Sequence, residues 1–322
     1  MTTLADPVAP WQRFLARTGR YISTPGWYSL VLDPLLKLRP SSTPVVVERY
    51  GNLVTLQLDD YVQRRVFCWS LARAELAFTA KWCQRGDVIV DVGANAGVFT
   101  LVGARSVGPD GAVLSIEPYP PSFDTLDHNI AINGYTNVKT IRAGLGARNT
   151  SLAIGMVDWA QGSGSVSATG TVNACEVPIR TLDEVAESLP PQSIRLLKVD
   201  VEGYEREVLT GARDTLRSPR APQIVLLEIN EIALARLRSS GREVVTELER
   251  AGYRLFRRTK PRTLVPFVPL SSESVRQGLR ALADTSRGPI HRLDRLMWSN
   301  RLLTDIVAIH PSTPLSEVSA AM

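Results

Sequence analysis

The sequence predicts an α/β fold in which a mostly parallel β-sheet is covered by helices on both faces. From Asp87 onwards, short apolar runs alternate with helical patterns, and such alternation is typical of parallel sheets. The runs are apolar throughout, as expected for strands that are buried on both faces. A glycine-rich turn, Asp91-Val-Gly-Ala-Asn-Ala-Gly97, joins the first of these runs to the first helical pattern. These features indicate a Rossmann-like sheet with a ligand site at that turn.

The individual elements follow from residue patterns in chain order. Ahead of the sheet, short strands are expected at Val45–Glu48, Leu53–Leu58 and Tyr61–Phe67, with turn signals at Tyr50–Asn52 and Asp59–Asp60, followed by a helix at Ala72–Cys83. The strands of the sheet are expected at Val88–Val92, Ala112–Glu117, Val138–Ala143, Ile194–Val199 and Gln223–Ile229. Helices are expected at Gly97–Val107, Ser122–Asn133, Glu205–Leu216 and Gly241–Ala251.

Composition indicates a soluble globular protein. Of the 322 residues, 44% are hydrophobic and 21% are charged, and this balance excludes wholesale disorder. Cys68, Cys83 and Cys175 are scattered without metal-ligand spacing, so we expect reduced thiols in a cytoplasmic protein. The chain shows no secretory signal pattern, and none of its apolar runs reaches the roughly 18 residues of a transmembrane helix.

The formal net charge of +5 does not by itself indicate a nucleic-acid partner. Only five of the 37 basic residues are lysine, and many arginines fall between Arg236 and Arg301. This region has no interleaved aromatic residues, helix-turn-helix pattern or zinc signature, so we expect no nucleic-acid binding. A solvated basic face is the expectation, and attraction to an acidic ligand or an anionic membrane surface is the alternative.

The glycine-rich turn does not fit a phosphate-bearing cofactor. A dinucleotide fingerprint needs glycine where this chain has Asn95 and Val98, and the first of those glycines lets the backbone approach a pyrophosphate. A Walker loop is excluded because no Gly-Lys-Ser/Thr follows. Backbone amides beside the carboxylate of Asp91 suit a zwitterionic amino-acid tail, since amides bind its carboxylate and an acidic side chain or a carbonyl binds its ammonium. S-adenosylmethionine (SAM) has such a tail and no phosphate.

Glu117 ends the second predicted strand of the sheet. A carboxylate at this strand tip accepts hydrogen bonds from both hydroxyls of a ribose. Because dinucleotide enzymes use an acidic residue in the same way, Glu117 supports a nucleoside cofactor without identifying it. A solvated strand cap is the structural alternative.

Catalysis is expected at the end of the fourth strand, in Leu196-Leu-Lys-Val-Asp-Val-Glu-Gly203. Strand periodicity places Lys198 and Asp200 on one face, with Glu202 just beyond the strand. Methyl transfer to an alcohol needs alignment and a proton acceptor, because the alcohol has a pKa of about 15. Asp200 is the first candidate for the base and Glu202 the second, with Lys198 orienting the carboxylate. A structural ion pair between Lys198 and a neighbouring carboxylate is the alternative reading.

Six motifs between residues 86 and 230 carry a family resemblance. They are Gly86-Asp-Val-Ile-Val-Asp-Val-Gly-Ala-Asn-Ala-Gly97, Ile116-Glu-Pro118, Asn129-Ile-Ala-Ile-Asn133, Thr181-Leu-Asp183, Leu197-Lys-Val-Asp-Val-Glu-Gly203 and Leu227-Glu-Ile-Asn230. With these motifs the chain resembles the FkbM-type SAM-dependent methyltransferases, and the resemblance covers roughly residues 45–260. The resemblance implies a class I methyltransferase sheet of seven strands, with the last strand antiparallel. It also implies O-methylation of a hydroxyl on a sugar, glycolipid or polyketide-like secondary metabolite.

The candidate cofactor-binding residues combine the glycine turn with acidic positions around it. They are Asp91, Gly93, Asn95, Gly97, Glu117, Pro118 and Glu75. No resident metal is predicted, although a metal-assisted reaction with Asp200, Glu228 and Asn230 as oxygen ligands is an alternative. His291 or His310 is a further candidate base from the C-terminal part of the chain, and His128 is expected on an exposed helix face. A Rossmann-type oxidoreductase and a non-catalytic scaffold are the alternatives from other classes.

The motifs also suggest how the chain is divided. Residues 1–44 are expected to form an N-terminal extension that contacts the acceptor, a partner or a membrane surface, and residues 45–84 lead into the core. Residues 85–260 form the SAM-binding domain, in which residues 150–178 break the strand–helix rhythm and predict an inserted hairpin. Residues 261–322, with a helical pattern at Ser274–Asp284, are expected to form a C-terminal extension that caps the acceptor. The oligomeric state is left open.

Overall fold

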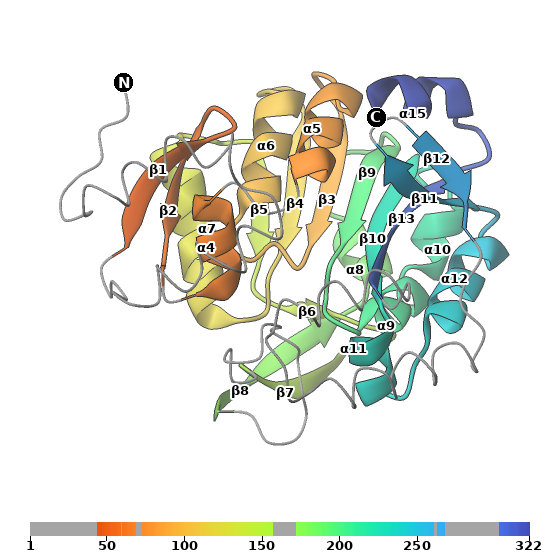
Figure 1. The fold of residues 1–322 in the computed structure, drawn as a ribbon. Coiled ribbons are helices and arrows are strands. Elements are labelled where there is room, and N and C mark those ends of the chain that lie inside the picture. Colours follow the sequence, from red (N-terminus) through yellow and green to blue (C-terminus); the bar gives the residue numbers. More distant parts are fainter. Residues whose placement is uncertain (1–43, 59, 69–72, 157–171, 261–262, 268–302) are drawn as a thin grey trace.

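The protein is built around one large, mostly parallel β-sheet (Figure 1). The computed structural model describes residues 44–58, 60–68, 73–156, 172–260, 263–267 and 303–322. Its eight-stranded sheet has the order β12-β11-β13-β10-β9-β3-β4-β5. In chain order these strands are β3 (Val88–Val92), β4 (Ala112–Ile116), β5 (Val138–Ile141), β9 (Ile194–Val199), β10 (Ile224–Asn230), β11 (Arg254–Lys260), β12 (Thr263–Pro266) and β13 (Leu303–Ile309).

The expected α/β architecture is confirmed. The five strands β5, β4, β3, β9 and β10 run parallel to one another. The last strand, β13, pairs antiparallel with β10 on one side and with β11 on the other. An additional edge strand, β12, pairs antiparallel with β11.

The position of β13 corrects the expected end of the core at residue 260. Residues 303–309 fall in the stretch that we expected to form a separate extension, yet they lie between β10 and β11 in the sheet. Ile306, Val307, Ala308 and Ile309 are buried, since a strand in this position is covered on both faces. Residues 303–309 are therefore part of the core. The N-terminal extension and the Ser274–Asp284 pattern lie outside the described residues.

Helices cover both faces of the sheet (Figure 1). One face packs against α5 (Arg73–Trp82), α6 (Val98–Val107) and α15 (Leu315–Ala321). The other packs against α8 (Leu182–Ala186), α9 (Glu205–Thr210), α10 (Arg213–Arg217), α11 (Glu231–Arg236) and α12 (Gly241–Arg250). Adjacent residues of one strand, such as Ile89 and Val90, belong to the hydrophobic clusters on opposite faces of the sheet. This arrangement explains why the strands are apolar throughout.

Two expected elements differ from the structure. The residues Tyr61–Phe67 form helix α4, not a strand, because Asp60 is an N-cap whose Oδ1 accepts a 2.8 Å hydrogen bond from the Gln63 amide. The helix expected at Glu205–Leu216 is divided into α9 and α10 at Gly211. A Cβ at Gly211 would lie 2.0 Å from the carbonyl oxygen of Gly146, so two backbone segments touch where the helix is interrupted.

Two smaller sheets adjoin the core. The hairpin β1 (Val45–Arg49) and β2 (Asn52–Leu56) packs against α4 and α7 (Pro120–Ile132). A three-stranded sheet has the order β6-β8-β7, from β6 (Gly144–Leu145), β7 (Thr150–Met156) and β8 (Val172–Arg180). In it, β7 and β8 pair antiparallel.

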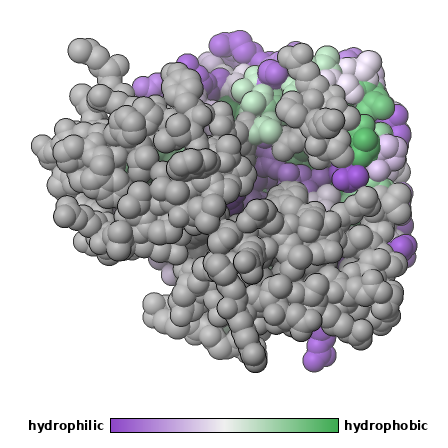
Figure 2. Space-filling view, viewed as in Figure 1, coloured by the Kyte–Doolittle hydropathy of each residue, from purple (hydrophilic) through white to green (hydrophobic). Residues whose placement is uncertain are grey.

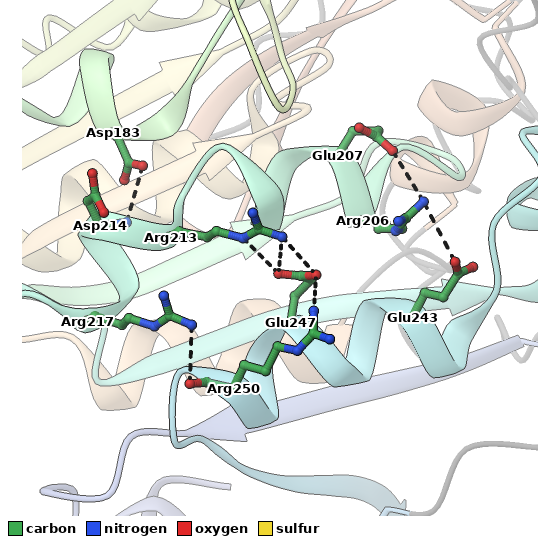
Figure 3. A network of polar contacts seen from close by, with 9 residues as sticks. All are labelled: Asp183, Arg206, Glu207, Arg213, Asp214, Arg217, Glu243, Glu247 and Arg250. Carbon is green, nitrogen blue, oxygen red and sulfur yellow. Dashed lines mark hydrogen bonds and ion pairs between the residues drawn. The ribbon is translucent and has the colours of Figure 1, made fainter.

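Charged residues on the surface are partly paired with one another. In Figure 3, Glu247 of α12 accepts hydrogen bonds from Arg213 of α10 and from Arg250, all between 3.0 and 3.1 Å. These contacts hold α10 against α12, and the one carboxylate of Glu247 is shared between two arginines. In the described part of Figure 2, hydrophilic and hydrophobic residues are mixed, and Leu53 is the one exposed large hydrophobic residue among those described. None of the helices described is both long and apolar enough to span a bilayer.

Candidate active site

The candidate site lies where the order of the sheet changes direction. From β3 the chain proceeds outwards through β4 to β5, whereas β9, on the other side of β3, leads to β10. Ligands of such sheets bind beyond the carboxyl ends of the strands at this switch point. Asp91 of β3 is in register with Lys198 of β9. The two strands thus bring the glycine turn and the candidate catalytic segment together.

The glycine turn depends on close contact with the end of β9. Gly93 has φ +80°, and a Cβ there would lie 1.9 Å from the carbonyl oxygen of Asp200. Gly97 has φ +84° and is the N-cap of α6. Asn95 also has positive φ, +49°, and its Oδ1 accepts a hydrogen bond from the amide of Ala96. The asparagine side chain therefore stabilises its own turn, at the position where a dinucleotide-binding loop has glycine.

The amides available to a ligand lie later than expected. Those of residues 93–97 all donate within the protein, to the Ile116 and Ala94 carbonyls, Glu117 Oε2 and Asn95 Oδ1. By contrast, the amides of Val98, Phe99 and Thr100 have no acceptor among the described residues. They form the first turn of the ten-residue helix α6, where unsatisfied amides and the helix dipole favour a carboxylate.

Asp91 is held below the site instead of facing the ligand. Its side chain is 0% exposed, because strand periodicity directs it towards α6. Thr100 Oγ1 donates to Asp91 Oδ2 at 2.7 Å and lies 2.8 Å from Ser115 Oγ. Since Thr100 gives its one proton to Asp91, Ser115 is the donor in the second contact. We therefore revise the expectation that the Asp91 carboxylate contacts the cofactor: in this structure it fixes α6 and β9.

Glu117 joins the tip of β4 to the glycine turn. Its Oε2 accepts a 2.8 Å hydrogen bond from the Asn95 amide, and its Oε1 accepts one of 2.9 Å from the Tyr119 amide. The side chain is 7% exposed, and burial raises its pKa to about 7, although both amides oppose the shift. A carboxylate has about four acceptor sites, so two remain. Pro118, half-buried, lies between Glu117 and Tyr119.

Lys198 forms ion pairs with two carboxylates, those of Asp200 after β9 and of Asp91 in β3. Its Nζ lies 3.1 Å from Asp200 Oδ2 and 3.5 Å from Asp91 Oδ1, and 5.5 Å from the centre of the Phe99 ring. Burial lowers the pKa of Lys198, but Asp200 and Asp91 outweigh it and the net pKa is raised. The ammonium therefore stays charged. The side chain of Asp200 is 48% exposed, so it faces the open side of the site while paired with Lys198.

Three further carboxylates surround this ion pair. Burial, followed by the charges of Asp200 and Glu205, raises the pKa of Glu202 to about 8. Glu202 has φ +52°, an uncommon conformation for a residue other than glycine. Burial also raises the pKa of Glu205 to about 7 and that of Glu228 well above its usual range, with Asp200 adding to both. Among the described residues, this end of β9 and β10 is strongly acidic.

The remaining candidate residues lie at different places. The charge of Glu75, in the first turn of α5, raises the pKa values of Lys198 and Glu228, so Glu75 acts on the catalytic side of the site. His310 directly follows Ile309, the last residue of β13. Ile309 pairs with Ile224, which lies at the amino end of β10. His310 therefore lies at the edge of the sheet opposite the site and is excluded as a base. His128 is exposed, as expected, and His291 is outside the described residues.

Of the three alternative metal ligands Asp200, Glu228 and Asn230, Asn230 has a structural role. No group of three or more His, Cys, Asp or Glu side chains is placed to hold a metal ion in the described ranges. Asn230 Oδ1 accepts hydrogen bonds from the amides of Ile232 and Ala233, both 3.2 Å. It is thus the N-cap of α11 and is directed at a helix, not at Asp200 and Glu228.

The strand order, the glycine turn at the switch point and the carboxylate at the tip of the second strand define a Rossmann-like nucleoside-binding domain. Residues 91–255, just over half of the 322-residue chain, match the family described as the methyltransferase FkbM domain. The chain belongs to this family. The expected class, a SAM-dependent methyltransferase domain, is therefore confirmed.

Individual relatives are similar over part of their length. Methyltransferase 1 of Beauveria bassiana is 30% identical over 146 residues, which are 39% of this chain and 58% of that protein. Hexuronic acid methyltransferase AglP of Haloferax volcanii is 31% identical over 150 residues, 46% of this chain and 57% of that protein. The chain thus spans less than two thirds of either relative. Among solved structures, a SAM-dependent O-methyltransferase from Thermotoga maritima aligns with 84% of this chain and 78% of its own, at 10% identity and a TM-score of 0.38.

Sequence reasoning missed several residues of the site. Thr100 and Ser115 carry hydroxyl groups within otherwise apolar sequence patterns. A polar residue at such a position is the one signal that could have revealed the buried contact. The sequence predicts Glu205 only as part of a helix, whereas its Oε1 accepts a hydrogen bond from the Gly203 amide. The contacts of Asn129 depend on the tertiary structure, and its motif alone does not reveal them.

Proposed function

We propose that the protein is a SAM-dependent O-methyltransferase that methylates a hydroxyl of a sugar, glycolipid or polyketide-like secondary metabolite. The observation that carries this proposal is the acidic end of β9 and β10, where Asp200, Glu202 and Glu228 lie around one lysine. A hydroxyl acceptor needs a base and donates hydrogen bonds to carboxylates. A carboxylate acceptor needs no base.

The fit of SAM rests on three features of the chain. The first-turn amides of α6 have no acceptor in the part of the chain that the structure describes, so they can bind its carboxylate. The carbonyl of Gly93, which has no donor among the described residues, suits its ammonium. The spare acceptor sites of Glu117 suit the ribose hydroxyls. When bound, SAM supplies an electrophilic methyl carbon.

The work of the chain is then to orient the acceptor and take its proton. A base is most effective when its pKa lies near the working pH, and the pKa of Glu202, about 8, meets this condition. Asp200, our first candidate from sequence, is paired with Lys198 at 3.1 Å, which weakens it as a proton acceptor. We therefore propose Glu202 as the base, with Asp200 holding the acceptor hydroxyl and Lys198 holding Asp200.

The sugar-like class of acceptor is supported by one relative, whose name describes it as a hexuronic acid methyltransferase. The proposal is tested with methyl-labelled SAM and a panel of acceptors that includes uronic acid glycosides, neutral sugars and hydroxylated macrolides. Products are then treated with alkali, which releases methanol from a methyl ester but leaves a methyl ether intact. We expect alkali-stable label. Label that alkali releases would place the transfer on a carboxylate and overturn the proposal of O-methylation at a hydroxyl.

A further inference from the structure

Two asparagines of α7 bind the free edge of β2. Asn129 Oδ1 accepts a 2.7 Å hydrogen bond from the Thr55 amide, and its Nδ2 donates to the Thr55 carbonyl at 3.1 Å. Asn133, the C-cap of α7, makes the same pair of contacts with Leu53, at 2.9 and 2.7 Å. Each side-chain amide thus replaces a residue of a neighbouring strand, because it satisfies both the N–H and the C=O of one residue.

The repeat distances of helix and strand explain this match. Residues four apart on a helix are about 6 Å apart along its axis, and residues two apart on a strand are about 6.7 Å apart. Asn129 and Asn133 can therefore meet Thr55 and Leu53 in turn. The contact holds the β1–β2 hairpin, which has no third strand among the described residues, against the main domain.

Of the two asparagines, only Asn129 also contacts the glycine turn. Its second Nδ2 proton is donated to the carbonyl of Ala96 at 2.8 Å, whereas the corresponding donation from Asn133 goes to the carbonyl of Asn129 within α7. On the far side of the same peptide unit, the Gly97 amide donates to the Ala94 carbonyl at 2.9 Å. The peptide that precedes α6 is thereby fixed at both ends. Its orientation sets the direction of the free amides in the first turn of α6.

We propose that Asn129 is a positioning residue for the cofactor, which couples the β1–β2 hairpin to the loop that binds SAM. The inference rests on the proposed function, since it concerns the same loop. Asn129 is 0% exposed and does not touch the ligand side, so it acts through Ala96 and Gly97. Coupling of this kind is reciprocal: the hairpin contact favours the binding-competent loop, and a bound cofactor stabilises the hairpin.

The test compares two matched substitutions. In both Asn129→Asp and Asn133→Asp, one side chain loses two N–H donations to backbone carbonyls and keeps its shape. We expect both to lower the melting temperature. Calorimetric titration with S-adenosylhomocysteine, at a temperature where circular dichroism shows each variant folded, should separate them: affinity falls by about tenfold in Asn129→Asp and by less than about twofold in Asn133→Asp. Asn129→Ser, which introduces no charge, should behave like Asn129→Asp.

Hydrogen exchange of the wild-type protein provides an independent readout. S-adenosylhomocysteine should slow amide exchange in the peptide Asn52–Leu56, and Asn129→Ser should abolish this effect. Equal affinities in the Asn129 and Asn133 variants, or exchange in that peptide that is unchanged by the ligand, would overturn the coupling while leaving the proposed function intact. If the wild-type protein binds no S-adenosylhomocysteine, the proposed function fails first, and this inference with it.

Discussion

The backbone amide of Asn95 donates a 2.8 Å hydrogen bond to Glu117 Oε2. This contact joins the turn after β3 to the tip of β4, so that one carboxylate connects the two parts of the chain that we propose hold the amino-acid end and the ribose end of the cofactor. The positive φ of Asn95 directs its amide towards Glu117.

Glu117→Ala should weaken binding of SAM by roughly 1.5–3 kcal/mol, because a charge-assisted contact to the ribose is lost. The amides of Asn95 and Tyr119 also lose their acceptor, so the turn becomes less ordered. Isothermal titration with S-adenosylhomocysteine measures the change. Glu176→Ala, at an exposed position of β8, is the control and should bind like the wild type. Unchanged affinity in Glu117→Ala would show that Glu117 does not contribute to cofactor binding.

The pH dependence of stability should follow the buried carboxylates. The pKa values of Glu117 and Glu205 in the folded protein are about 7, raised from the usual 4.5 by burial. The folded state therefore holds these protons more tightly than the unfolded state, and the free energy of unfolding falls as pH rises from about 4.5 to 7. Thermal melts between pH 5 and pH 8 should show this decline.

Glu117→Gln should reduce that slope, because one of the carboxyl groups that titrates in this range is removed. Affinity for the cofactor should change in the opposite direction and rise over the same range, since only the ionised Glu117 accepts both hydroxyls. A melting temperature that rises steadily from pH 5 to pH 8 would contradict the assignment.

Gly93→Ala should destabilise the protein and disturb the site. An added Cβ would lie 1.9 Å from the Asp200 carbonyl oxygen and would need φ +80°. Gly86→Ala is a matched control, because Gly86 has φ +86° with no atom within 4 Å of an added Cβ. The control carries only the backbone strain, of order 1 kcal/mol. Chemical denaturation should show a clearly larger loss in Gly93→Ala; equal losses would mean that the close contact with Asp200 is not required.

Lys198→Met should cost about 3–5 kcal/mol of folding free energy, the range for removing one partner of a buried ion pair. The loss arises because Asp91, fully buried, is left without its counter-charge. Lys139→Met, at an exposed position of β5, is the control for removing a lysine. Asp91→Asn in the Lys198→Met background should restore part of the stability. A double variant no more stable than Lys198→Met would show that Asp91 does not depend on the ammonium.

The two candidate bases are separated by their pH profiles. If Glu202 is the base, single-turnover transfer should rise with pH up to about 8, and Glu202→Gln should lower the rate about 10²–10⁴-fold. Asp200→Asn should retain more activity and shift the profile to lower pH, because the charge of Asp200 raises the pKa of Glu202. An Asp200→Asn variant as inactive as Glu202→Gln, without a shifted profile, would restore Asp200 as the base.

The repeating core was predictable because each of its strands is apolar and bounded by turn residues. For β3 and β9 the expected limits agree with the structure. The sequence pattern predicted the wrong element where tertiary contacts determine the secondary structure. Tyr61–Phe67 has strand-like residues, but the cap at Asp60 and the packing of Val66 and Phe67 make it helical. The strand β13 was obscured because it is inserted between two strands that precede it in the chain.

The site was predictable at the level of residue types but not of orientation. The position of Asp91 at a strand tip suggested ligand contact, whereas its side chain faces α6 and is buried. The sequence likewise could not reveal that the amides of the glycine turn are used internally, since their acceptors at Ile116 and Glu117 come from another strand. The roles expected for residues 1–44 and for the acceptor-capping extension after residue 260 remain predictions.

We propose that the first turn of α6, the carbonyl of Gly93 and Glu117 together bind a nucleoside cofactor with an amino-acid tail and no phosphate. Calorimetric titration of the wild-type protein with S-adenosylhomocysteine, and separately with NAD, tests it most directly. We predict saturable binding of one S-adenosylhomocysteine per chain and no heat of binding with NAD. Tight binding of NAD, or the absence of S-adenosylhomocysteine binding by the folded protein, would contradict the claim.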